Sequence, residues 1–207
     1  LASGDMLSGD REEGDAIAVA LLSRLSDLAP VCFVNGNHEM CVERHQPERY
    51  QKFMDDLKNG GVQVLHNETA WFWIDGEKVA VTGYELPWEY YRRFSRRHPS
   101  VVGMERSIGK RKQDAYQILL THNPVFFEEY TAWGADFTFA GHLHGGFIRL
   151  PYFGGVISPQ FQLFPKYDHG LYQMDTSSMV VGAGMGNHSG LFRINNPTEV
   201  VTVRIKR

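Results

Sequence analysis

Three apolar stretches of the sequence each end in a polar cluster that contains histidine. The clusters are residues 36–39 (Gly-Asn-His-Glu), 121–124 (Thr-His-Asn-Pro) and 141–144 (Gly-His-Leu-His). Imidazole nitrogens and amide oxygens suit divalent ions such as Mn, Fe, Co or Zn. If the apolar stretches are parallel strands, their carboxyl ends meet at one edge of a sheet. The pattern therefore indicates a metal site assembled from distant parts of the chain.

A fourth cluster lies at the beginning, where residues 1–5 (Leu-Ala-Ser-Gly-Asp) resemble the end of a strand followed by Gly-Asp. A carboxylate in this place can bridge two cations about 3.5–4 Å apart. The candidate ligands are then Asp5, Asn37, His122, His142 and His144. If residues 142–144 are extended, the two histidines point to opposite sides and serve two different ions. Gly-Asp alone is a weak signal, since it recurs at residues 9–10, so the prediction depends on the four clusters together.

The composition is that of an ordinary globular protein. The chain has 207 residues, of which 43% are hydrophobic and 22% charged, and we expect one domain over residues 1–207. The formal net charge of −3 argues against a specific nucleic-acid partner, which needs a basic face. The two cysteines exclude a disulfide framework, and Cys32, within an apolar run, is predicted to be a buried small hydrophobe. No apolar run approaches the roughly 20 residues of a membrane span.

The apolar patterns predict two helices and a series of short strands. The helices cover residues 15–28, with Asp15 as N-cap, and residues 47–59. Strands are predicted over residues 31–34, 62–65, 70–74, 79–82, 117–121 and 137–140, followed by short antiparallel runs that include 191–194 and 200–205. Helices alternate with strands early and strands dominate late, which favours an α/β (α+β) fold with two packed sheets flanked by helices.

The order of the four clusters resembles the calcineurin-like metallophosphoesterase family over nearly the whole chain. Residues 141–146, followed by Leu150 and Pro151, resemble its single-domain bacterial branch, which includes enzymes related to lipid-sugar pyrophosphatases. The resemblance implies a four-layer sandwich of two mixed β-sheets flanked by helices. It also implies two divalent metal ions, and hydrolysis of a phosphomonoester, phosphodiester or pyrophosphate bond by in-line attack of a hydroxide that bridges them.

The resemblance further implies roles for individual residues. Asp5 bridges the two ions, and His144 binds the second of them. The shell of the first ion is completed by Asn37, His122 and His142. His38 stays off the metals, faces the scissile phosphate and protonates or stabilises the leaving oxygen, with Glu39 expected to orient it.

One departure from the family pattern concerns the N-terminal side. The family begins with Asp-x-His at the end of its first strand, whereas only four residues precede Asp5 here. We interpret the chain as truncated on this side; an anchor upstream of Leu1 would make the protein membrane-associated instead of cytoplasmic. The rival interpretation is a non-catalytic metal-binding scaffold or regulatory protein that retains the fold. The presence of His38 favours the enzyme, because a scaffold needs no acid for a leaving group.

A dense basic stretch follows residue 91 and has two interpretations. Arg92, Arg93, Arg96 and Arg97, interleaved with aromatic residues, suit a lid that meets an anionic or lipid-linked phosphate, or an anionic membrane surface. They equally suit a solvated helix whose aromatic side chains pack inward. His188, in the glycine-rich loop 182–190, is a further weak candidate for the mouth of the site. The expected partners are a small-molecule or lipid-linked phosphate substrate and, on the first interpretation, a membrane surface.

Overall fold

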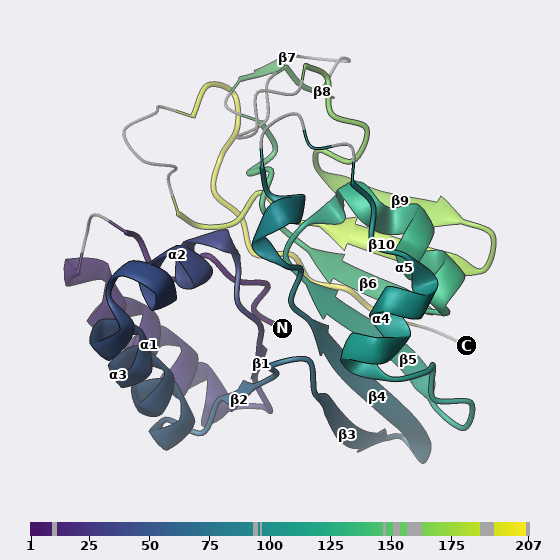
Figure 1. Ribbon diagram of the computed structural model, residues 1–207, viewed down its shortest axis with the longest axis horizontal. Helices are drawn as coiled ribbons and strands as arrows, with labels where there is room; N and C mark the ends of the chain where they lie inside the picture. The colour runs from purple at the N-terminus through teal and green to yellow at the C-terminus, as the bar shows by residue number, and fades with distance from the viewer. Residues whose placement is uncertain are drawn as a thin grey trace.

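A computed structural model describes residues 1–9, 12–92, 95, 97–146, 148–150, 154–156, 163–186 and 193–205 of the chain. Its centre is a six-stranded sheet with the order β3-β4-β5-β6-β10-β9 (Figure 1). The four inner strands run parallel, and each outer strand is antiparallel to its neighbour. The strands are β3 (Thr69–Ile74), β4 (Glu77–Tyr84), β5 (Tyr116–Thr121), β6 (Phe137–Ala140), β9 (Gly170–Met174) and β10 (Ser177–Val181).

A second, smaller sheet lies beside the N-terminus. Strands β1 (Cys32–Phe33) and β2 (Gln63–Val64) pair in parallel, and Ala2 pairs with Phe33 from the other side. A third pair, β7 (Arg149–Leu150) with β8 (Gly154–Gly155), lies at one end of the molecule (Figure 1). The helices are α1 (Glu13–Ser26), α2 (Asn37–His45), α3 (Pro47–Asn59), α4 (Val101–Ile108) and α5 (Phe127–Trp133), with short 3-10 turns η1 (Trp88–Tyr90) and η2 (Pro124–Phe126).

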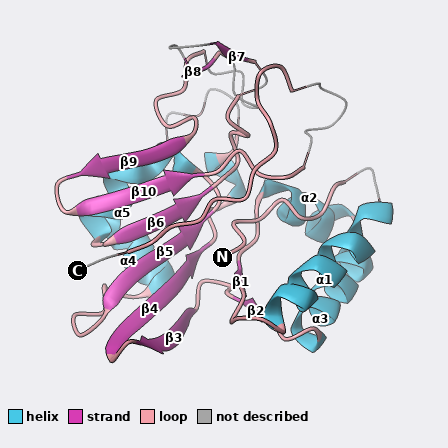
Figure 2. Cartoon of the chain, turned by 180° about the vertical axis from the view of Figure 1, so that it is seen from behind, coloured by secondary structure: helices cyan, strands magenta, loops and turns pink. Residues whose placement is uncertain are grey.

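The helices and the two main sheets form four layers. Helices α1 and α3 cover the outer side of the small sheet, and α4 and α5 cover the far face of the large sheet (Figures 1 and 2). Successive side chains in the small sheet separate the layers: Phe33 packs toward the helices against Phe53, with ring centroids 6.3 Å apart. Cys32 and Val34 belong to the core between the sheets. The predictions of a layered sandwich and of a buried Cys32 are therefore confirmed.

The large sheet divides its side chains in the same way. Ile118 and Leu120 of β5 join the core between the sheets, whereas Leu119 joins the core under α4 and α5. This alternation follows from the period of two in a strand, and both faces are apolar because both are covered. It explains why the parallel strands appear as continuous apolar runs in the sequence.

Several predicted elements need correction. Helix α1 has Glu12 at its N-cap, and Asp15 lies inside the first turn. The smaller sheet contains only parallel pairs among the described residues, so it is not mixed. Residues 200–205 form no strand, and residues 191–192 of the predicted run 191–194 lie outside the described residues. Helices α2, α4 and α5 were not predicted; they are short, and α2 begins inside the polar cluster at residues 36–39.

No helix in the described ranges combines the length and the apolar character needed to cross a bilayer.

The interpretation of the basic stretch as a helix is wrong for the part that the structure describes. Trp88–Tyr90 is a single 3-10 turn, and none of the described residues from 91 to 100 is α-helical.

The core between the sheets should dominate stability. Leu120→Ala removes a side chain with no solvent exposure, and the cavity it leaves is expected to lower the free energy of unfolding by about 2–5 kcal/mol. Leu171→Ala on β9, where the side chain is 62% exposed, is the matched control and should cost less than about 0.5 kcal/mol. Urea denaturation measures both. Equal effects of the two substitutions would contradict the assignment of Leu120 to the core.

Candidate metal centre

Three of the predicted ligands converge at the ends of neighbouring segments. Asp5 follows the segment that pairs with β1, His122 follows β5, and His142 follows β6. One ligand atom from each lies within 4.8 Å of the other two. Nε2 of His122 is 3.0 Å from Oδ2 of Asp5 and 3.1 Å from Nδ1 of His142. Because β5 and β6 are adjacent and parallel, their carboxyl ends deliver the two histidines side by side.

A hydrogen bond to the backbone fixes the orientation of the His122 ring. Its Nδ1 lies 2.5 Å from the backbone carbonyl oxygen of Ser3, which can only accept a hydrogen bond, so Nδ1 carries the proton. The lone pair of the neutral ring is then on Nε2, the atom that faces Asp5 and His142. A backbone acceptor that holds the rear nitrogen of a histidine is the usual arrangement behind metal ligands.

Two buried polar atoms beside this cluster test whether a cation fits. Oδ1 of Asn37 and Nε2 of His142 are buried and have no hydrogen-bond partner among the residues that the structure describes. Buried polar atoms are nearly always paired, and each unpaired one costs free energy. Asn37 adjoins the cluster, since the backbone N–H of the next residue, His38, donates to Oδ1 of Asp5 over 2.9 Å. An amide oxygen and an imidazole nitrogen left without donors, next to a carboxylate, fit a divalent ion.

The charges of the cluster depend on one another. Burial opposes ionisation of Asp5, but the adjacent His122 holds the pKa of that carboxyl well below its usual range. Burial opposes a charge on His122 as well, yet Asp5 outweighs it and the pKa of His122 is raised. Burial lowers the pKa of His142, and positive charge on His122 lowers it further. A cation competes with a proton for Nε2 of His122, so its affinity should increase with pH.

Glu39 joins the two loops that carry Asp5 and Asn37. Its carboxylate has no solvent exposure and accepts four backbone hydrogen bonds of 2.6–2.8 Å. The donors are the N–H groups of Asp5, Met6, Leu7 and Gly36. Burial and the nearby Asp5 raise the pKa of Glu39, and the hydrogen bonds from the N–H groups of Leu7, Gly36 and Asp5 oppose them. Glu39, expected to orient His38, thus positions the backbone around Asp5, a role that the sequence analysis missed.

The two loops touch through their glycines. A Cβ on Gly4, which has a φ of +90°, would lie 2.3 Å from the backbone nitrogen of Gly36. A Cβ on Gly36 would lie 2.2 Å from Oδ1 of Asp5. Only glycine permits this contact, which explains why Asp5 and Asn37 are each preceded by one.

The loop that carries His142 and His144 is not extended, so the condition under which the two histidines would point to opposite sides is not met. His142 and His144 have φ values of +63° and +50°, and Gly145 and Gly146 follow at +69° and +82°. Side chains alternate between opposite sides only along an extended segment, so that alternation does not apply to these two histidines. Left-handed backbone is unfavourable for residues other than glycine. His144 nevertheless lines the same cavity as His142.

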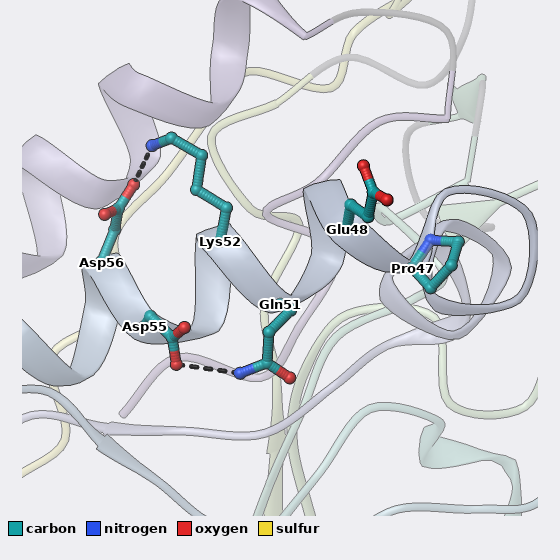
Figure 3. Close-up of a pocket in the computed structure, with 6 residues that line it drawn as sticks. All are labelled: Pro47, Glu48, Gln51, Lys52, Asp55 and Asp56. Carbon is teal, nitrogen blue, oxygen red and sulfur yellow. Dashed lines mark hydrogen bonds and ion pairs between the residues drawn. The ribbon is translucent and has the colours of Figure 1, made fainter.

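A cavity of about 750 Å³ opens onto the cluster. It is lined by the predicted residues Asp5, His38, His122, His142 and His144, and by apolar side chains of α1, β6 and β10. A separate depression lies over α3, where Gln51 pairs with Asp55 and Lys52 with Asp56 (Figure 3). None of the predicted site residues lines that depression, so the cavity is the candidate site.

The basic stretch is not part of this cavity in the described residues. Arg92 and Arg97 are exposed and do not line it. Arg97 forms an ion pair with Glu89, with Nη1 of the arginine 3.5 Å from Oε1 of the glutamate. Arg93, Arg96 and His188 lie outside the described residues.

An aromatic side chain that the sequence analysis did not select covers the histidines. The buried ring of Tyr91 packs edge-on against His142, with centroids 5.3 Å apart, and lies 6.0 Å from the ring of His122. No sequence signal distinguished it from the other aromatic residues around the basic stretch, because only the tertiary structure places it over the site.

Replacing Glu39 by Gln should loosen the centre. In the Gln variant an NH2 group replaces one carboxylate oxygen and faces two backbone N–H groups, which are left buried without an acceptor. This loss is expected to lower the free energy of unfolding by on the order of 3 kcal/mol. Glu43→Gln, on the exposed side of the same helix α2, makes the same chemical change and should have little effect. Urea denaturation of both variants is the measurement. A Glu39 variant as stable as the Glu43 variant would refute the proposed clamp.

Comparison with known proteins identifies relatives among phosphoesterases. YkuE of Bacillus subtilis, an uncharacterized metallophosphoesterase, is 30% identical over 89% of this chain and 59% of its own length. The uncharacterized protein YpbG of the same organism is 27% identical over 72% of this chain and 53% of its own length. The phosphodiesterase YaeI of Escherichia coli is 24% identical over 99% of this chain and 69% of its own length.

The chain thus spans between half and two thirds of the length of the two Bacillus relatives. A sequence profile described as calcineurin-like phosphoesterase matches residues 1–146. This range includes all five predicted ligands, from Asp5 to His144. The chain therefore belongs to the calcineurin-like phosphoesterase family.

Proposed function

We propose that this chain carries the metal centre of a phosphoesterase that hydrolyses a phosphoric ester bond. The observation that carries the proposal is the convergence of Asp5, His122 and His142, with their ligand atoms within 4.8 Å of one another at the wall of a cavity. Membership of the calcineurin-like phosphoesterase family supports the same reaction class.

The residues of the centre divide into two groups. Asp5, His122 and His142 would hold a divalent ion together with the unpaired amide oxygen of Asn37. His144, on the same cavity wall, is the candidate ligand of a second ion. Divalent ions bound here would neutralise charge on the phosphate oxygens and make hydroxide available near neutral pH. The low pKa of Asp5 keeps its carboxylate ionised for this purpose.

His38 is the candidate proton donor to the leaving oxygen. Its side chain lines the cavity beside the cluster, and its backbone N–H is anchored on Oδ1 of Asp5 over 2.9 Å. This bond fixes the start of helix α2, and therefore the place of the His38 ring, relative to the ligands. A proton donor beside the cluster assists the departure of an alcohol or phosphate group.

A phosphodiester is the first substrate class to test. The relative named a phosphodiesterase aligns with 99% of this chain, and this likeness favours a diester over a monoester. The non-catalytic scaffold remains the alternative, and it differs in one measurable respect: it binds metal without turnover. Activity against bis-p-nitrophenyl phosphate and p-nitrophenyl phosphate separates the three possibilities.

Metal should be required for hydrolysis. A chelator is expected to abolish turnover of bis-p-nitrophenyl phosphate, and added Mn²⁺ or Co²⁺ should restore it, because the proposed nucleophile is a water that the divalent ions would activate. Asp5→Asn should lower both metal affinity and turnover at least about tenfold, since it removes the only anionic ligand of the described cluster. Asp75→Asn, on an exposed turn, is the control. Turnover that survives complete metal removal would exclude the proposal.

His38→Ala should separate catalysis from metal binding. Loss of the proton donor is expected to lower turnover by about 10²–10⁴-fold while metal content stays near that of the unmodified protein. His45→Ala, on the exposed end of the same helix, controls for changes in α2. The measurement is kcat for bis-p-nitrophenyl phosphate with metal content determined on the same samples. Unchanged kcat at full metal content would reject the role of His38.

A further inference from the structure

The C-terminal segment crosses the loop of His142 and His144, outside the part of the chain that the family profile matches. Asn196 is 4% exposed, and its side-chain nitrogen donates to the carbonyl oxygens of His144 over 2.5 Å and of Gly146 over 2.7 Å. The profile ends at residue 146, fifty residues before Asn196 in the chain. One amide therefore links the end of the chain to the loop that carries two candidate ligands.

The amide fits the hollow of the loop closely. A Cβ on Gly145 would lie 2.8 Å from Oδ1 of Asn196, so the glycine leaves room for the side chain. The two N–H groups of the amide match two carbonyl acceptors, and the opposite orientation of the amide would set its oxygen against both carbonyl oxygens. Shape and hydrogen bonding thus both select asparagine at this place.

The loop depends on such support because its backbone is strained. His142 and His144 both have positive φ values, which residues with a Cβ adopt only when the surroundings hold them there. Within the loop, Leu143 donates to the carbonyl of Gly141 and Gly146 donates to that of Leu143. The carbonyl groups of His144 and Gly146 receive their hydrogen bonds from Asn196.

The segment around Asn196 is itself anchored on both sides. Ile194 pairs with Ile148, and its carbonyl accepts from the backbone N–H of Arg149 over 3.1 Å. On the other side, Glu199 accepts from the backbone N–H of Ala183 over 2.7 Å and contacts Nε2 of His169 at 2.8 Å. These contacts fix the position of the Asn196 side chain relative to the loop.

We propose that Asn196 is a positioning residue of the metal centre, which holds the left-handed backbone of residues 142–146 so that His142 and His144 face the cation. The proposal rests on the proposed function, because it assigns Asn196 a part in the same centre. Residues behind metal ligands typically change metal affinity by about 10–100-fold when they are replaced. Asn196 is not among the residues that line the cavity, so it would act through the loop.

The test uses Co²⁺ alone, whose visible absorption reports ligand geometry. Asn196→Asp keeps the shape but sets a carboxylate against two carbonyl oxygens, so Co²⁺ affinity should fall at least about tenfold and the absorption spectrum should change. Asn195→Asp makes the same change in charge at the exposed neighbouring residue and should alter affinity by less than about twofold. Asn196→Ala removes the donors without adding charge, and it should weaken binding in the same direction; circular dichroism verifies folding of each variant.

Two outcomes would overturn the proposal in distinguishable ways. If both Asn196 variants bind Co²⁺ with the affinity and spectrum of the unmodified protein, Asn196 does not position the loop, while the metal centre stands. If the unmodified protein binds Co²⁺ no better than Asp5→Asn, the metal centre itself is wrong and the role of Asn196 falls with it.

Discussion

The structure of the centre depends on one buried carboxylate. Glu39 accepts four backbone hydrogen bonds from two loops, one around residues 5–7 and the other at Gly36. Burying a carboxylate costs free energy, and here the four backbone hydrogen bonds that Glu39 accepts offset that cost. The result is backbone contact between the Gly-Asp and Gly-Asn motifs, which sets Asp5 beside Asn37 and fixes the start of α2.

The sheet supplies the other half of the centre. Parallel neighbours β5 and β6 deliver His122 and His142 to the same edge, and the carbonyl of Ser3 turns His122 toward Asp5. The two halves meet only because the small sheet packs on the large one through a common apolar core. Packing between the layers therefore determines the distance between the carboxylate and the imidazoles, and with it the fit to a cation.

Electrostatics and conformation both fit this cluster to a cation. A carboxylate, a histidine with a raised pKa and a neutral histidine share a buried space, and an amide oxygen beside them lacks a donor among the described residues. The left-handed loop around His144 is a strained arrangement held from outside by Asn196. Strain and unpaired polar atoms tend to gather at functional sites, where binding compensates for them.

The sequence alone was enough to predict the chemistry of the candidate centre and the order of its parts. Apolar runs ending in polar clusters are local signals, so β5, β6 and helix α3 (Pro47–Asn59) could be predicted together with Asp5, His122 and His142. The roles of Glu39, Tyr91 and Asn196 could not, because each depends on a partner that is distant in the chain and brought near by packing. The left-handed backbone at His142 and His144 was likewise decided by tertiary contacts, since local propensity disfavours it for residues with a Cβ.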